Sequence, residues 1–271
     1  MSIHPTAIIG PDVRLGTDVT VGPYAVIEGH TTIGNGSEIK ARAHITGYTE
    51  IGEGNIIHMG AVIGHEPQDI AFKGERSYLK IGNNNVFREG SYIHRGTKPE
   101  SATVIGNNNY FMAYSHAGHN CLIGNNNIFV CNALLAGYVE VGSNAFLSGN
   151  VVVHQFCRIG SFAIISGLSA VNKDIPPFMT AGGRPAMVTG LNSVGLRRGG
   201  FSADQRSAIK EAFRILFRNG YGTKKAIEEL QKLPETAEVN DIISFVNSSA
   251  RGICAGMEYK KQSADESMRG E

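Results

Sequence analysis

Apolar side chains recur at every sixth position along the first two thirds of this 271-residue chain. The series is unbroken from Ile9 to Ile63 and returns in the same phase, after two interruptions, as far as Val171. Its positions are Ile9, Leu15, Val21, Ile27, Ile33, Ile39, Ile45, Ile51, Ile57, Ile63, Ile81, Phe87, Ile93, Ile105, Phe111, Ala117, Ile123, Phe129, Leu135, Val141, Leu147, Val153, Ile159, Ile165 and Val171. Six residues are too few for a helix but suit one short strand and one turn, which predicts an all-β solenoid of hexapeptide repeats.

A second period of 18 residues sets the shape of the solenoid. Glycine often follows the apolar position, and it recurs at Gly16, Gly34 and Gly52, three hexads apart. We expect these glycines to occupy corners that need a positive φ, and three hexads to close one triangular coil of a parallel β-helix. Small residues precede the apolar position by two, as at Ala25 and Ala43.

Runs of three asparagines follow Ile-Gly at three places, which are 83–85, 107–109 and 125–127. Stacked coils lie about 4.8 Å apart, so these side-chain amides are predicted to bond from coil to coil.

Two interruptions, near 65–80 and 96–103, leave the phase intact and are predicted to be loops ejected from corners, where function concentrates. The repeat fades after Pro176-Pro177, which predicts a β-helix domain over 1–190 and a helical domain over 191–271. Ser202 and Gln205 form a capping-box pattern before a helix that we expect to stop at Gly220. A second helix is expected from Thr223, a third around residues 239–246, and a polar, disordered tail from about 258. These helices are expected to cover the open end of the coils.

Composition and charge narrow the class of protein. A net charge of +1 gives no general attraction for nucleic acid. The chain has no signal-peptide pattern and no transmembrane segment. Its four cysteines, with no CxxC pair, are expected to be buried, reduced thiols: Cys121, Cys131, Cys157 and Cys254. We therefore expect a cytoplasmic protein without a metal or other cofactor.

Candidate chemistry lies in polar residues that interrupt the scaffold, above all His94, His116, His119 and His154. An imidazole with its ordinary pKa near 6.5 is suited to proton transfer at neutral pH. His116 and His119 lie three residues apart across a corner, which makes them the stronger candidates.

The segments Ser115-His116-Ala117-Gly118-His119, Ile93-His94-Arg95-Gly96, Val153-His154-Gln155-Phe156 and Arg197-Arg198 resemble the UDP-N-acetylglucosamine acyltransferases, and the resemblance spans nearly the whole chain. It implies a left-handed β-helix and a homotrimer. It also implies transfer of an (R)-3-hydroxyacyl group from acyl carrier protein to the glucosamine 3-position of the UDP-sugar, the first step of lipid A biosynthesis.

The resemblance also implies roles for individual residues. His119 matches the general base and Gly137 the backbone donor to the oxyanion. Gln68 and Asp69 match sugar-binding positions, and His94 and His116 match further substrate-binding positions, His116 near the acyl or pantetheine groove. Positions around the sugar nucleotide are His154, Gln155, Asn192 and Arg198. Gly167 matches a position whose bulk limits acyl length, so a glycine there implies a long chain.

Three departures from the family pattern leave alternatives open. Asn120 replaces an aspartate, Tyr138 replaces a histidine and Ala71 replaces a lysine, so the acceptor is either the 3-hydroxyl or its 3-amino analogue. A sister N-acyltransferase normally has an additional N-terminal domain, whereas here the repeat begins within ten residues. A zinc hydratase of this fold needs three histidines at a different spacing, and a plain scaffold leaves the histidine cluster and the charged loop unexplained.

Overall fold

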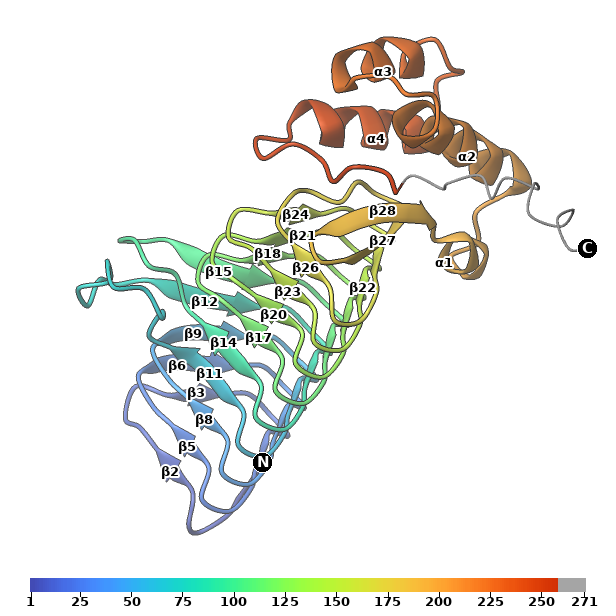
Figure 1. Ribbon diagram of the computed structural model, residues 1–271. Coiled ribbons are helices and arrows are strands. Elements are labelled where there is room, and N and C mark those ends of the chain that lie inside the picture. The colour runs from blue at the N-terminus through green and yellow to red at the C-terminus, as the bar shows by residue number, and fades with distance from the viewer. Residues whose placement is uncertain (258–271) are drawn as a thin grey trace, which may run out of the picture.

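The structure is a computed structural model that describes residues 1–257. The chain winds into a prism of three parallel sheets, with a group of helices at one end (Figure 1). The predicted left-handed parallel β-helix with a C-terminal helical part is confirmed.

Each sheet takes one strand from each successive coil. Sheet A contains β1 (Ser2–Ile3), β4 (Thr20–Val21), β7 (Glu38–Ile39), β10 (Ile56–Ile57), β13 (Val86–Phe87), β16 (Tyr110–Phe111), β19 (Ile128–Phe129), β22 (Phe146–Leu147), β25 (Ile164–Ile165), β27 (Met179–Gly183) and β28 (Ala186–Leu191). Sheet B contains β2 (Ile8–Ile9), β5 (Val26–Ile27), β8 (His44–Ile45), β11 (Val62–His65), β14 (Tyr92–His94), β17 (His116–Ala117), β20 (Leu134–Leu135), β23 (Val152–Val153) and β26 (Ala170–Val171). Sheet C contains β3 (Arg14–Leu15), β6 (His30–Ile33), β9 (Tyr48–Ile51), β12 (Tyr78–Ile81), β15 (Ala102–Ile105), β18 (Leu122–Ile123), β21 (Glu140–Val141) and β24 (Arg158–Ile159).

The core is the inside of the prism, and the six-residue series fills it. Ile27, Ile45 and Ile93 have no exposed surface, and each fully buried side chain of this size stabilises the fold by roughly 1.5 to 3 kcal/mol. Phe111 lies between Phe87 and Phe129 in a stack, with ring centroids 5.0 and 4.4 Å apart. The small residue two positions earlier is buried in most hexads as well, as at Ala25 and Ala43.

The turns differ from the prediction in one respect. Most glycines directly after the apolar position, such as Gly16 and Gly34, do not adopt a positive φ, with Gly64 as an exception. They are required because coils approach closely there: a Cβ on Gly34 would lie 2.5 Å from the carbonyl carbon of Gly52. The positive φ falls two residues later and is taken by large residues as well as small ones, for example +58° at Tyr138 and +66° at Phe156.

The asparagine runs form ladders between coils, as predicted. The middle residue of a run takes the left-handed turn, with φ of +57° at Asn108. The third is buried and bonds along the prism: the Asn109 backbone amide donates to Asn85 Oδ1 at 2.8 Å, and the Asn127 amide donates to Asn109 Oδ1 at 2.9 Å. These bonds satisfy backbone donors that the turns leave unpaired.

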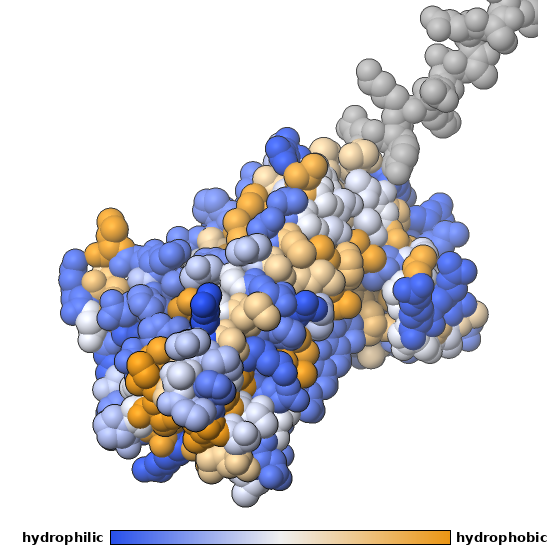
Figure 2. Space-filling model, turned by 90° about the horizontal axis from the view of Figure 1, so that it is seen from below, coloured by the Kyte–Doolittle hydropathy of each residue, from blue (hydrophilic) through white to orange (hydrophobic). Residues whose placement is uncertain are grey.

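The two ends of the prism differ. At the C-terminal end β27 and β28 form an antiparallel hairpin that the sequence did not predict. The helices follow it as α1 (Ser193–Arg198), α2 (Ala203–Phe217), α3 (Thr223–Leu230) and α4 (Ala237–Asn247). The capping box of Ser202 and Gln205 at α2 is confirmed, whereas α1 was not predicted. At the N-terminal end apolar residues are exposed (Figure 2), among them Met1, Ile3 and Ile8.

Two loops leave the prism in consecutive coils, between β11 and β12 and between β14 and β15. The division into domains at residue 190 stays a prediction, and the predicted disordered tail lies outside the described residues. Cys121, Cys157 and Cys254 are buried, whereas Cys131 is exposed because it occupies a turn instead of an inward position. Among the helices within residues 1–257, none is long and apolar enough to cross a membrane.

Candidate active site

The edge of the prism where sheet B turns into sheet C, which we name the B–C edge, gathers most of the candidate residues. His119 lies in the turn between β17 and β18, and Gly137 occupies the same turn one coil later. The loop of residues 66–77 leaves this edge two coils before His119 and carries Asp69 back toward it. The in-register pairing of β11, β14, β17 and β20 therefore stacks these turns in one column.

The His119 imidazole is 7% exposed and lies between two polar side chains. Its Nδ1 is 3.1 Å from Asn120 Oδ1, and its Nε2 is 3.6 Å from Asp69 Oδ2. The Thr97 backbone amide donates to the same Asn120 oxygen at 3.0 Å, which identifies that atom as an acceptor. Nδ1 of His119 therefore carries a proton, and in the neutral ring Nε2 is the nitrogen with the lone pair that a general base requires.

Gly137 lies directly against this lone pair. A Cβ at position 137 would be 2.4 Å from His119 Nε2, so only glycine fits beside the imidazole. Within the described residues, the Gly137 backbone amide has no hydrogen-bond acceptor. A backbone amide without an acceptor therefore lies beside the His119 imidazole, and acyl transfer uses a hydrogen-bond donor of this kind to stabilise an oxyanion.

Aromatic rings form one wall beside His119. The Tyr138 ring meets the His119 ring edge-on, with centroids 5.2 Å apart, and stacks on Phe156 at 5.0 Å. Phe156 is half exposed. The sequence interpretation gave this stack no role, although the spacing of 18 residues between Tyr138 and Phe156 indicates equivalent corners of neighbouring coils.

His94, which is buried, and His116, which is partly buried, form a pair next to His119, with ring centroids 5.1 Å apart. Their Nδ1 atoms donate to backbone carbonyl oxygens, His94 to Glu66 at 2.6 Å and His116 to Leu135 at 3.1 Å. Burial, and then the neighbouring His116, lower the pKa of His94 to about 4, and burial also lowers the pKa of His116. Both rings are therefore neutral near pH 7, and their buried Nε2 atoms have no partner among the described residues.

The remaining candidates divide between two places. His154 and Gln155 follow β23 on the B–C edge, and Gln68 is exposed on the loop that carries Asp69. Asn192 and Arg198 instead line a groove on the outer face of sheet A, and Gly167 lies at the edge between sheets A and B. One copy of the chain therefore does not bring these last three residues to His119.

Asn192 has a clear local task. Its Oδ1 accepts from the Gly195 amide at 2.8 Å and caps α1, while its Nδ2 donates to the Phe162 carbonyl at 2.8 Å. Across residues 1–257, no group of three or more histidine, cysteine, aspartate or glutamate side chains is arranged to hold a metal ion.

Two family models match the chain. One, described as Udp N-acetylglucosamine O-acyltransferase, Domain 2, covers residues 174–254. The other, described as bacterial transferase hexapeptide (six repeats), covers residues 30–65.

Curated relatives match over nearly the full length. An acyl-[acyl-carrier-protein]--UDP-N-acetylglucosamine O-acyltransferase from Sulfurihydrogenibium sp. is 60% identical over 96% of this chain and 97% of its own. A protein of the same name from Chlorobaculum parvum is 54% identical over 93% of this chain and 96% of its own.

Solved structures agree with these relatives. The UDP-N-acetylglucosamine acyltransferase of Francisella novicida superposes with a TM-score of 0.91 at 36% identity, over 93% of this chain and 94% of its own. That of Bacteroides fragilis has a TM-score of 0.90 at 41% identity, over 92% and 98% of the two chains. The chain belongs to the UDP-N-acetylglucosamine O-acyltransferase family.

Proposed function

We propose that this protein transfers an acyl group from acyl carrier protein to UDP-N-acetylglucosamine, the first step of lipid A biosynthesis, with His119 as the base. The observation that carries the choice of base is the place of His119 Nε2, which lies 3.6 Å from Asp69 Oδ2 and directly beside Gly137. The relatives named above act, by their names, on the same two substrates.

The chemistry follows from these three groups. As the oxygen or nitrogen of the acceptor attacks the thioester carbonyl carbon, His119 Nε2 takes the proton from that attacking atom. Such a base contributes roughly 10² to 10⁴ in rate. The Gly137 N–H stabilises the negative charge that develops on the carbonyl oxygen. The C–S bond then breaks, and the imidazolium returns its proton to the departing thiolate.

Asp69 supports this cycle electrostatically. Its Oδ2 is 3.6 Å from Nε2 and a quarter of its side chain is exposed. A carboxylate at about 4 Å stabilises an imidazolium by about 1 kcal/mol in water and about 4 kcal/mol at the effective dielectric of a protein surface. Asn120, in place of an aspartate, fixes the tautomer of His119 without adding a second charge.

We propose that a homotrimer completes the site. The outward residues along sheet A are largely apolar, including Ile128 and Phe146, and exposed Leu134 and Val152 lie on sheet B. The outward residues of sheet C include the ion pair of Arg158 with Glu140. Apolar outer faces of this kind require a partner, and a second copy supplies Arg198 to the phosphates and Gly167 to the acyl groove.

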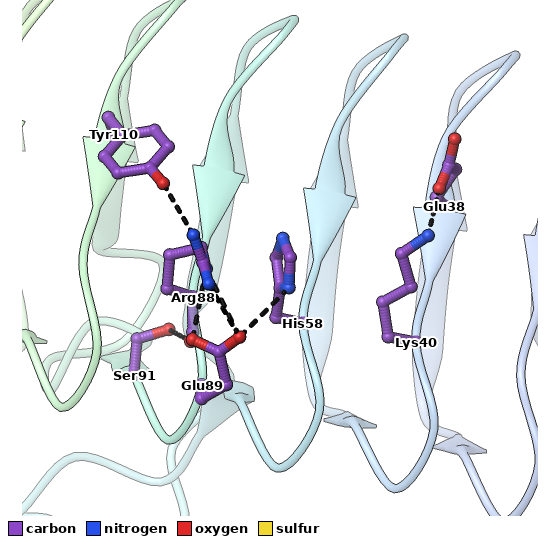
Figure 3. Close-up of polar contacts among 7 residues, drawn as sticks. All are labelled: Glu38, Lys40, His58, Arg88, Glu89, Ser91 and Tyr110. Atoms are coloured by element: carbon purple, nitrogen blue, oxygen red, sulfur yellow. Dashed lines mark hydrogen bonds and ion pairs between the residues drawn. The ribbon is translucent and has the colours of Figure 1, made fainter.

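Polar groups near sheet A satisfy one another within the chain (Figure 3). Arg88 donates to the Glu89 carboxylate at 3.0 Å and to the Tyr110 hydroxyl at 2.8 Å, and His58 Nδ1 is 3.4 Å from Glu89. This internal pairing lets the face enter an interface without leaving an unpaired charge.

The other binding roles are part of the same proposal. Gln68 and Asp69 hold the sugar, and the neutral pair of His94 and His116 borders the acyl or pantetheine groove. Around the nucleotide, His154 and Gln155 contact the ligand, while Asn192 positions the α1 helix that carries Arg198. Glycine at 167 leaves room for a long 3-hydroxyacyl chain. We place the enzyme in the cytoplasm, where carrier protein and nucleotide sugar occur, with no role for nucleic acid.

The test is mass-resolved transfer from a panel of hydroxyacyl carrier proteins to UDP-N-acetylglucosamine and its 3-amino analogue. The wild type should form one product series, and His119→Ala should lose at least about 10²-fold in turnover while it keeps the circular dichroism spectrum. His4→Ala, on the exposed N-terminal coil, is the matched control. Absence of product from the wild type with both acceptors contradicts the function, and an active His119→Ala contradicts the base.

A further inference from the structure

Arg95 directly follows β14 and is almost buried, with 9% of its surface exposed. Its side-chain contacts are with the segment that carries Asp69. Nη1 donates to the Gly64 carbonyl oxygen at 3.3 Å, and Nη2 is 3.6 Å from Glu66 Oε1. The guanidinium carbon lies 5.2 Å from the centre of the Phe72 ring.

These contacts lie on both sides of Asp69 in the sequence. Gly64 and Glu66 precede it, and Phe72 follows it. Residues 66–77 contain no helix or strand, and Ile70 is 96% exposed. Its internal bonds are short-range: the Ala71 amide donates to Asp69 Oδ1 at 2.9 Å, and the Phe72 amide to the Asp69 carbonyl at 3.0 Å. Such a turn holds its own shape, and its place relative to the prism depends on contacts from outside it. Besides Arg95, these are the His94 bond to the Glu66 carbonyl at 2.6 Å and the bond from the Glu100 amide to the Arg76 carbonyl at 2.8 Å.

The prism provides room for this side chain. A Cβ on Gly47 would lie 3.2 Å from Arg95 Nη1, so a larger residue at 47 would press on the guanidinium. The Arg95 backbone amide donates to the His65 carbonyl at 3.2 Å, which joins the residue to the base of the loop. A buried guanidinium is costly unless it is paired and hydrogen-bonded, and here its partners are Gly64 at the base of the loop and Glu66 in the loop.

We propose that Arg95 is a positioning residue, whose guanidinium holds the 66–77 loop so that the Asp69 carboxylate lies over His119. This inference rests on the proposed function, because it assigns to Arg95 an effect on the reaction that passes through Asp69. Arginine suits the task because its planar fork bonds and stacks at the same time, whereas lysine offers one point charge.

A double-mutant cycle tests this dependence. Asp69→Asn removes the carboxylate charge, and Arg95→Ala should lower kcat by a similar factor, about 10- to 100-fold, since about 1 Å of misplacement has effects of this size. In the Asp69→Asn background, Arg95→Ala should cause no more than about a threefold further loss. Losses that multiply overturn the proposal, because Arg95 would then act independently of Asp69.

A second readout does not depend on turnover. Trypsin cleavage at Lys73 and Arg76 reports how firmly the loop is held, and Arg95→Ala should accelerate it at least about tenfold while Asp69→Asn leaves it unchanged. Phe72→Leu, which removes the stacked ring but no charge, should accelerate cleavage to a smaller extent. Equal cleavage in wild type and both Arg95→Ala and Phe72→Leu overturns the proposal.

One further variant keeps the proposal testable. If Arg95→Ala does not fold, Arg95→Lys takes its place. It should have a kcat and a protection from trypsin below those of the wild type, with losses smaller than those expected for Arg95→Ala. An inactive wild type refutes the proposed function, whereas an active wild type with multiplying losses refutes only the role of Arg95.

Discussion

Replacing Gly137 by alanine tests how tightly the backbone holds the base. The new Cβ would lie 2.4 Å from Nε2 and 2.5 Å from Cε1 of His119, whereas non-bonded contact is most favourable at about 3.5 Å. The imidazole must withdraw by about 1 Å, a displacement that costs on the order of 10²-fold in rate. This factor corresponds to about 2.7 kcal/mol of transition-state stabilisation. The backbone amide is retained, so the loss belongs to the position of the base.

Gly149→Ala is the matched control. Gly149 occupies the same place in its hexad on another edge, and the nearest atom to its Cβ would be 3.5 Å away. The assay is kcat/KM with saturating acyl carrier protein, beside thermal unfolding of both variants. Gly137→Ala with activity within about threefold of wild type refutes the reasoning, as does an equal loss in Gly149→Ala.

Two further predictions concern stability. The pKa of His94 is about 4 in the folded protein, against about 6.5 in the unfolded chain, so the unfolded chain binds the proton more readily between these pH values. The free energy of unfolding is therefore highest above pH 6.5 and falls by up to about 3 kcal/mol as the pH drops toward 4. His94→Asn, which retains a donor toward Glu66, should reduce the difference between the free energies of unfolding measured with urea at pH 7 and at pH 4.5. The same difference in wild type and variant would contradict this prediction. Asn109→Ala leaves the buried Asn127 amide without its acceptor and should lower the free energy of unfolding by about 1 to 3 kcal/mol. Asn107→Ala, at a partly exposed rung, should cost less, and a larger loss there would refute the role of burial.

The repeating part of the fold could be predicted because one physical requirement recurs in every hexad. Ile27 and Ile45 meet the same need for an inward apolar side chain, so the period is visible in the sequence alone. The non-repeating parts were harder. The β27–β28 hairpin begins after Pro177, where the period ends, and α1 spans only Ser193–Arg198, too short for a helical pattern to emerge.

The turn chemistry could be predicted only in part, because one residue type answers two requirements. Glycine permits a positive φ and also permits close approach, and the sequence does not distinguish them. Gly34 serves the second, while Tyr138 and Phe156 take the positive φ. Similarly, the motifs identified His119, but its relation to Asp69 depends on the path of an irregular loop.

The two loops that leave the B–C edge in consecutive coils have an evolutionary consequence. Because the hexad phase resumes at Tyr78 and again at Ala102, residues can be added to or removed from either loop without shifting a single inward side chain. Selection can therefore alter these loops, to which we assign substrate contacts, while the inherited interior stays constant. In a prism of this kind, substrate specificity can change during evolution without a change in the residues that stabilise the fold.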